Sequence, residues 1–343
     1  MRIVKTAISI TLSASALLYG SNTLADTQIL TSIKPLELLV RAIATDDMQT
    51  TTLVPPGSSP HNYSMAPSKR QALESADIIF WVGPEMETFL TRLLTGGEFA
   101  ERSVALMNSG IKSSEQEDED HAHHDDHDEH GEHSEHDEHE ERAAHDTHGH
   151  DEHEEHATHD THGHDHGDGE DPHIWVDPQI AITMAESIRD ALVQLDDVDQ
   201  PALDRNLESF KAAVAQKEKQ IRKQLEPLKD ISLFAYHSAF TPFGEHYNLN
   251  VEGVLTLNPE LSPGARHIAE VQDQLRSAHH PCLLTEPQFN RQWWHSVTEG
   301  LDVTFSTWDP LATDIAATKN GYEAFQQSIA DAVLKCLPEN TEH

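Results

Sequence analysis

The stretch PALDRNLESFKAAVAQKEKQIRKQLEPL, residues 201–228, divides the chain into two similar halves. Apolar residues recur along it at helical spacing, and Lys, Arg, Gln and Glu fill the positions between them. A helix of this length reaches roughly 35 Å at about 1.5 Å per residue. The narrow apolar stripe and the polar ends predict one long rigid helix that runs along two lobes.

Strand and helix patterns alternate on both sides of this helix. Before it, strand patterns at 27–33, 51–54, 77–82 and 104–107 alternate with helix patterns at 35–44, 68–75, 84–94 and 177–195. After it, strand patterns at 231–236, 252–256, 281–285 and 303–306 alternate with helix patterns at 262–277, 290–298 and 320–337. This alternation predicts an α/β fold of two similar lobes, each a mostly parallel β-sheet flanked by helices. We expect the lobes to span residues 26–200 and 229–343.

The first 25 residues have the features of a secretory signal peptide. Arg2 and Lys5 precede a short apolar run from Ala7 to Leu18, and small residues lie three before and one before a cut at Asp26. The run is too short for a permanent transmembrane helix, although an N-terminal anchor is the alternative. No later apolar run is long enough to span a bilayer. We therefore expect an exported periplasmic protein with no permanent membrane anchor.

Residues 115–171 consist mainly of His, Asp and Glu, and the segment HDTHGHD occurs twice in them. Because this stretch has almost nothing apolar to bury, we expect a disordered loop inserted in the first lobe. Neutral imidazoles beside carboxylates suit divalent metals. The candidate accessory metal-binding residues are His124, His127, His130, His133, His136, His139, His148, His150, His153, His156, His159, His162 and His164.

The same loop carries most of the charge. It holds 25 acidic residues and one Arg, and so contributes about −24 to the formal net charge of −37. The rest of the chain is only moderately acidic. This balance excludes a nucleic-acid partner, which requires clustered Lys and Arg, and it favours a cation.

The chain has two cysteines, Cys282 and Cys336. In an exported protein such a pair is most simply a disulfide, and two free buried thiols are the alternative. The disulfide closes a loop of about 55 residues, which is worth about 4 kcal/mol in the loop-entropy description.

Three histidines outside the acidic loop lie at or just beyond strand ends, or where the fold resumes after the loop. His61 follows the strand pattern 51–54, His173 follows the loop, and His237 ends the strand pattern 231–236. Ligands of open α/β sheets bind beyond the carboxyl ends of the strands, so these side chains can converge between the lobes. The competing interpretation is three separate surface histidines. Five others lack this placement and are expected to be surface or structural residues: His246, His267, His279, His280 and His295.

Three imidazoles and one oxygen form a ligand set typical of zinc. Asp309, in WDPLATD after the last strand pattern, is the candidate fourth ligand, and a water molecule is the alternative. The carboxylates on either side of His173, Asp171 and Asp177, can orient its imidazole.

Five segments resemble the metal-specific solute-binding proteins of bacterial ABC transporters, most closely their periplasmic zinc-binding members. They are LTSIKPLELLVRAIA (30–44), LVPPGSSPHNYSMAPS (53–68), DPHIWVDP (171–178), FAYHSAF (234–240) and TEPQF (285–289). The resemblance implies zinc ligands at His61, His173 and His237, a His-rich loop and a disulfide between Cys282 and Cys336. In manganese-binding relatives a carboxylate at the place of Asp309 completes the set. The chain departs at Pro60, where some zinc-binding members have an acidic residue.

These observations predict capture of Zn²⁺ in the cleft between the lobes and its delivery to the inner-membrane permease of an ABC importer, by a monomer that is not an enzyme. The loop is expected to be an accessory low-affinity zinc scavenger or sensor; a zinc buffer and an acidic spacer are the alternatives. Other interpretations are a periplasmic zinc store or metallochaperone, a manganese-binding relative and, with least support because the chain lacks HExxH, a zinc hydrolase. We expect affinity to fall below about pH 6, as imidazoles protonate near pH 6.5.

Overall fold

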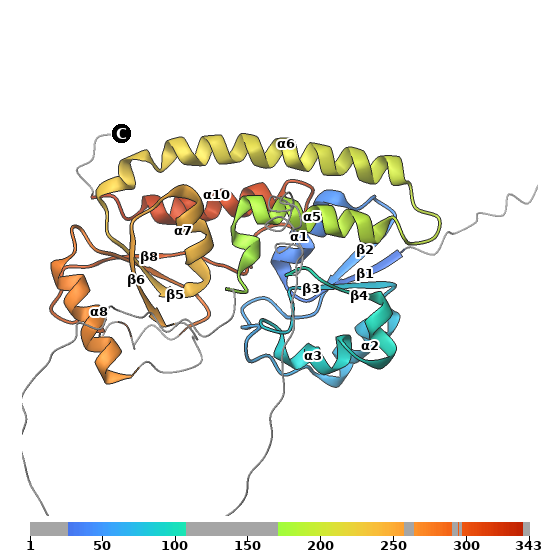
Figure 1. Ribbon diagram of the computed structural model, residues 1–343, viewed down its shortest axis with the longest axis horizontal. Helices are drawn as coiled ribbons and strands as arrows, with labels where there is room; N and C mark the ends of the chain where they lie inside the picture. The colour runs from blue at the N-terminus through green and yellow to red at the C-terminus, as the bar shows by residue number, and fades with distance from the viewer. Residues whose placement is uncertain (1–26, 108–170, 257–263, 290–293, 295–296, 339–343) are drawn as a thin grey trace, which may run out of the picture.

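Two parallel β-sheets of the same strand order form the framework of the chain (Figure 1). The computed structural model describes residues 27–107, 171–256, 264–289, 294 and 297–338. The first sheet has the order β2-β1-β3-β4 and the second the order β6-β5-β7-β8. The strands of the first are β1 (Thr27–Thr31), β2 (Met48–Thr52), β3 (Ile78–Trp81) and β4 (Ser103–Ala105), and those of the second are β5 (Leu233–His237), β6 (Val251–Thr256), β7 (Cys282–Thr285) and β8 (Thr304–Thr307). The prediction of two similar parallel α/β lobes is confirmed.

Helices cover both faces of the first sheet. On one face lie α2 (Pro67–Ser75) and α3 (Thr88–Leu94), whose Leu73 and Leu90 pack with Leu30 and Trp81 of the strands. On the other face lie α1 (Lys34–Ile43) and α5 (Pro178–Leu192). Because both faces are covered, β3 is an uninterrupted apolar run, IIFW, in which every residue is buried.

The second sheet is enclosed in a similar way. α8 (Ala265–Ser277) packs its buried Val271 and Leu275 against the outer face. α7 (Thr241–Tyr247) and α10 (Gly321–Leu334) pack on the other face of this sheet, as part of the large apolar cluster. Cys282 at the start of β7 and Cys336, just beyond α10, form the predicted disulfide, with their Cα atoms 5.6 Å apart.

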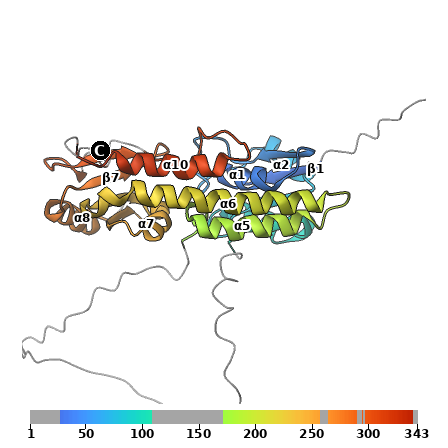
Figure 2. The same ribbon diagram turned by 90° about the horizontal axis from the view of Figure 1, so that it is seen from above.

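The long helix α6 (Gln200–Gln224) spans both lobes and lies between α10 and α5 (Figure 2). Its buried side is the predicted stripe, which includes Leu203, Phe210 and Ile221. The α-helix ends four residues earlier than the sequence indicated, and a 3-10 helix (Glu226–Asp230) follows it. Pro227 explains the change, because proline has no amide hydrogen for the α-helical ladder.

The lobes also meet directly, through α1 and α10. A Cβ atom at Gly321, the first residue of α10, would lie 2.8 Å from the carbonyl oxygen of Ala316 and 2.9 Å from Cδ2 of Leu38 in α1. One continuous apolar cluster contains residues of both lobes, among them Ile29 and Leu233. The predicted domain limits at 200 and 229 therefore stay a prediction, because the helices form a shared layer rather than two separate covers.

The predicted helix 84–94 begins only at Thr88, since the carboxylate of Glu87 accepts hydrogen bonds from the amides of Val82 and Gly83 and holds the preceding turn. The predicted helix 290–298 lies mostly outside the described residues, as do the signal peptide and the His-rich loop. Among the described helices, none combines the length and the apolar character needed to cross a membrane.

Candidate metal centre

The three candidate ligands His61, His173 and His237 meet between the lobes. His61 lies in the loop between β2 and α2, His173 opens the 3-10 turn Ile174–Val176 before α5, and His237 is the last residue of β5. One nitrogen from each ring can be chosen so that all three lie within 4.8 Å of one another. Across the described residues this is the one group of three or more potential ligands that meets that distance.

The ring geometry is that of a preformed site. The Nε2 atoms of His61 and His173 are 3.2 Å apart, and the centroids of the His173 and His237 rings are 4.4 Å apart. His173 and His237 are buried and His61 is half-buried. Nε2 of His237 is buried and has no hydrogen-bond partner among the described residues, so its lone pair is available to a cation.

Carboxylates hold the opposite nitrogens of two of these rings. Nδ1 of His173 donates to Oδ1 of Asp171 at 2.5 Å, and Nδ1 of His237 donates to Oε1 of Glu286 at 3.1 Å. A proton on Nδ1 places the lone pair on Nε2, which is the arrangement that metal-binding histidines adopt. Asp171 also accepts the backbone amide of His173, so it fixes the start of this segment.

Burial keeps the rings of His61 and His173 neutral. Desolvation, together with the charges of His173 and His237, lowers the pKa of His61 to about 3. Desolvation also lowers the pKa of His173, although Asp171 opposes this. The same burial raises the pKa of Glu286, against the effect of its hydrogen bond with His237. Neutral imidazole is the form that binds metal, so the site is ready to accept a cation at neutral pH.

Asp309, the expected fourth ligand, is not brought into this group. Its Oδ1 accepts from Nε2 of Gln288 at 2.6 Å and from the amide of Leu311 at 3.0 Å, and its Oδ2 accepts the amide of Thr313 at 2.8 Å. The structure thus places this carboxylate as an organiser of the loop after β8. Asp309 nevertheless lies close to the site, since its hydrogen-bond partners Gln288 and Leu311 line the cavity in front of the histidines.

The cavity in front of the three rings is small. Its volume is about 10 Å³, and Pro60, Trp175 and Phe289 contribute to its wall. A space of this size holds about one water molecule or one ion. The site therefore suits a bare or nearly bare cation and has no room for an organic molecule.

The segment that follows His173 is hydrogen-bonded to the second lobe, although it belongs to the first in sequence. Nε1 of Trp175 donates to the carbonyl of Pro310 at 2.9 Å. On α10, the hydroxyl of Tyr322 donates to the carbonyl of Trp175 and Nε2 of Gln326 donates to the carbonyl of Val176, both at 2.9 Å. His173 and His237 therefore share one support, whereas the loop that carries His61 leaves from the first sheet.

The remaining candidates divide into two groups. The thirteen accessory histidines of the acidic loop lie outside the described residues. Of the histidines expected to be structural or on the surface, His267 and His279 contact the backbone carbonyls of Leu255 and Asp230, and His246 forms ion-pair contacts with Asp177 and Glu218. Sequence reasoning missed Glu286, although its position directly after β7, in the TEPQF segment, was an available signal.

The fold and the site define a metal-binding protein of the two-lobed α/β solute-binding class. The model of the family described as "ZnuA: Zinc-uptake complex component A periplasmic" matches residues 29–336. The chain belongs to this family.

Two curated relatives are similar over nearly their whole length. The chain is 35% identical to the high-affinity zinc uptake system protein ZnuA of Yersinia pestis, covering 95% of this chain and 96% of the relative. It is 36% identical to the protein of the same name from Haemophilus influenzae, covering 94% and 96%. A crystal structure of ZnuA with 20% identity covers 90% of this chain and 99% of that one at a TM-score of 0.62, which shows the shared fold.

Proposed function

We propose that this chain captures Zn²⁺ between its two lobes and delivers it to the permease of an ABC importer in the inner membrane. The observation that carries the proposal is the convergence of His61, His173 and His237 on a cavity of ion size. The relatives named as high-affinity zinc uptake proteins support both the cargo and the transport role. Membership of an uptake family supports a role in which the chain captures zinc and does not catalyse a reaction.

The spacing of the nitrogens supports zinc. Zn–N bonds of about 2.0–2.1 Å in a tetrahedron place neighbouring nitrogens about 3.3 Å apart. The Nε2 atoms of His61 and His173 are already 3.2 Å apart. Three imidazole nitrogens also favour zinc over manganese, which prefers oxygen ligands. The manganese-binding alternative is therefore the weaker one.

A water molecule is our proposed fourth ligand. Pro60 offers no donor beside His61, and the oxygens of Asp309 accept hydrogen bonds from its own loop. Glu286 is engaged with Nδ1 of His237. The cavity has room for one small ligand, and a tetrahedral zinc ion with three histidines has one open position.

The remaining parts of the proposal rest on the sequence. The first 25 residues direct export, and the mature protein works as a monomer in the periplasm. Residues 115–171 collect zinc weakly at several sites and raise its concentration beside the cleft. This loop ends at Asp171, which holds His173, so captured ions are released next to the tight site.

Calorimetry of metal-free protein tests the proposal. The chain without residues 115–168 should bind one Zn²⁺ tightly, and His237→Ala in this background should lose the tight phase. An unchanged tight phase in His237→Ala rejects the site. Scavenging by the loop is rejected if the intact chain shows the same stoichiometry as the shortened one. Growth on low zinc distinguishes an importer component, which is required, from a zinc store, which is not.

A further inference from the structure

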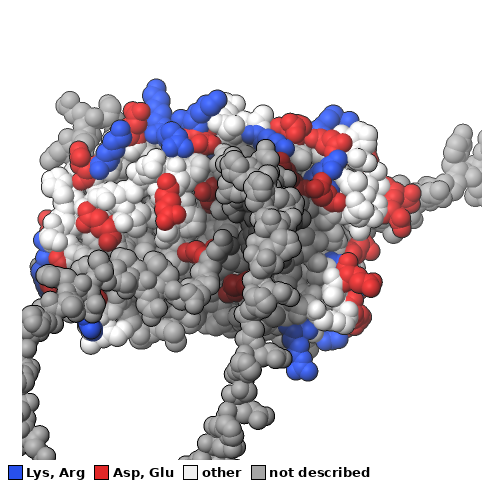
Figure 3. All heavy atoms as spheres, in the orientation of Figure 1, with Lys and Arg blue, Asp and Glu red and all other residues white. Residues whose placement is uncertain are grey.

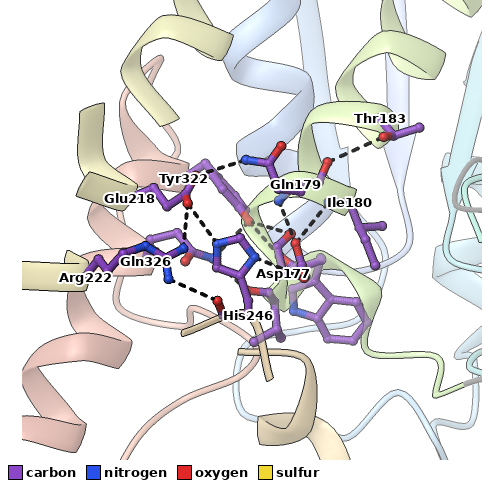
Figure 4. Close-up of polar contacts among 11 residues, drawn as sticks. Asp177, Gln179, Ile180, Thr183, Glu218, Arg222, His246, Tyr322 and Gln326 are labelled. Carbon is purple, nitrogen blue, oxygen red and sulfur yellow. Dashed lines mark hydrogen bonds and ion pairs between the residues drawn. The ribbon is translucent and has the colours of Figure 1, made fainter. Parts of the chain in front are cut away.

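His246 lies between two carboxylates that come from different parts of the fold (Figure 4). Its Nδ1 is 3.4 Å from Oδ2 of Asp177, and its Nε2 is 3.3 Å from Oε1 of Glu218. His246 lies in α7 of the second lobe and Glu218 lies in the long helix α6. Asp177 immediately precedes α5 of the first lobe. One imidazole ring therefore joins both lobes and the helix that connects them.

Asp177 is one helical turn away from the proposed ligand His173. The amide of Asp177 donates to the carbonyl of Ile174 at 3.3 Å, and the amide of Val176 donates to the carbonyl of His173 at 3.2 Å. Oδ1 of Asp177 accepts the amides of Gln179 and Ile180 as the N-cap of α5, whereas Oδ2 faces His246. Because a single short turn connects them, a displacement of Asp177 moves His173 as well.

The charge of the imidazole decides the strength of this link. Only the protonated ring can donate from both nitrogens at once. Burial opposes the charge, but the ion-pair contacts with Asp177 and Glu218 outweigh it and raise the pKa of His246. Other titratable or charged groups border the same junction, on α6, α7 and α10: Lys217, Arg222, Tyr247, Tyr322 and Glu323.

Two of these neighbours bear directly on the link. Arg222 donates to Oε1 of Glu218 at 2.8 Å, which shares that oxygen with His246. The hydroxyl of Tyr322 lies 3.4 Å from the carbonyl of Asp177 and supports the same turn from α10. The turn is therefore held on one side by neutral hydrogen bonds from α10 and on the other by the charged contact with His246.

We propose that His246 is a positioning residue for the metal centre: by bridging Asp177 and Glu218, it holds the turn that begins at His173 at the spacing from His237 that the cation requires. The inference rests on the proposed function, since it concerns the geometry of that same site. It adds a histidine that never touches the metal and whose protonation promotes zinc binding, in contrast to the ligands, whose protonation opposes it.

Zinc affinity of His246→Gln in the full chain tests this inference, measured by chelator competition at pH 6.5 and pH 9. Glutamine can still donate to one carboxylate but carries no charge. We expect the tight site to weaken about tenfold at pH 6.5, the lower end of the effect of residues that orient metal ligands. The difference from the wild-type protein should shrink at pH 9, where the wild-type ring is also neutral.

His279→Gln is the matched control, because the ring of His279 contacts the carbonyl of Asp230 and the ring of His280 rather than a carboxylate, and the variant should retain wild-type affinity at both pH values. Glu218→Gln breaks the link from the α6 side, so a poorly folded His246→Gln does not end the test. The double variant His246→Gln/Asp177→Asn should lose no more affinity than the stronger single variant.

The inference is overturned if His246→Gln and Glu218→Gln bind zinc like the control, or lose affinity equally at both pH values. If the wild-type chain itself shows no tight zinc binding, the proposed function is overturned.

Discussion

The Nε2 atoms of His61 and His173 lie 3.2 Å apart, although 112 positions separate the two residues in the chain. The fold achieves this because His61 follows a strand of the first sheet, whereas His173 is held by α10 and the loop at Pro310. With His237 at the end of β5, the chain presents three nitrogens to one small cavity.

Each proposed ligand should be individually necessary for tight zinc binding. Replacing His61 or His173 by Ala leaves two imidazoles, and we expect the affinity of the tight site to fall at least 100-fold. Chelator competition on the chain without residues 115–168 measures this fall without the weak sites of the loop. His279→Ala is the control, because its ring contacts the carbonyl of Asp230, which precedes the start of β5, whereas His237 is the last residue of that strand. A loss below about tenfold in either ligand variant contradicts the assignment.

The tight site should keep its zinc in mild acid, contrary to the expectation from ordinary imidazoles. Three imidazoles with pKa values of about 6.5 lose affinity roughly 1000-fold by pH 5.5. The pKa of His61 is lowered to about 3 and that of His173 is also lowered, so protons compete far less. We expect a loss below about 30-fold between pH 7 and 5.5, measured calorimetrically on the chain without residues 115–168.

The same shifts make the metal-free protein less stable in acid. The unfolded chain takes up protons at His61 and His173 as the pH falls through about 6.5, whereas the folded chain resists protonation there. Their contribution to the free energy of unfolding is present above this pH and is lost progressively towards pH 3. Urea unfolding at pH 7 and pH 5 should show the fall, and His61→Ala/His173→Ala should show a smaller one. A fall of equal size in that variant contradicts the explanation.

Glu286→Gln should weaken zinc binding without removing a ligand. The carboxylate accepts from Nδ1 of His237, and loss of such a partner typically costs about 10–100-fold in affinity. Glu252→Gln is a suitable comparison, since Glu252 accepts from the hydroxyl of Ser232 in the same lobe. Equal affinities of the two variants would show that Glu286 does not orient the ligand.

Asp309→Asn distinguishes a water from a carboxylate as the fourth ligand. Because Asp309 accepts the amides of Leu311 and Thr313, its replacement should lower the melting temperature and leave zinc affinity within about threefold. A drop of 100-fold or more in affinity would instead make Asp309 a ligand after a rearrangement of its loop.

Much of this architecture was predictable from the sequence. Placement after a strand selected His61 and His237, because parallel strands bring their carboxyl ends to one edge of a sheet, and His173 was selected because the fold resumes there after the acidic loop. Helix ends were less predictable: Pro227 stops α6 early, and Glu87 delays α3. These differences arise from single residues within otherwise periodic patterns.

The contacts between distant segments could not be predicted. Glu286 reaches His237 only because β7 lies next to β5 in the sheet, an order that the sequence pattern leaves open. The packing of Gly321 against Leu38, and the support of His173 by α10, likewise depend on how the two lobes meet. Asp309 was selected by placement alone, which does not reveal that nearby amides occupy its oxygens.

The shared support of His173 and His237 has a kinetic consequence. A cation that enters the cleft meets the nitrogens of His173 and His237 already assembled, as in a rigid bidentate chelator. The loop that carries His61, residues 53–66, then acts as a single arm that completes the coordination. Release of the cation begins with the opening of that arm. We therefore expect the lifetime of the zinc complex, rather than the rate of its formation, to depend on residues 53–66, and stiffening this arm should slow the handover of zinc.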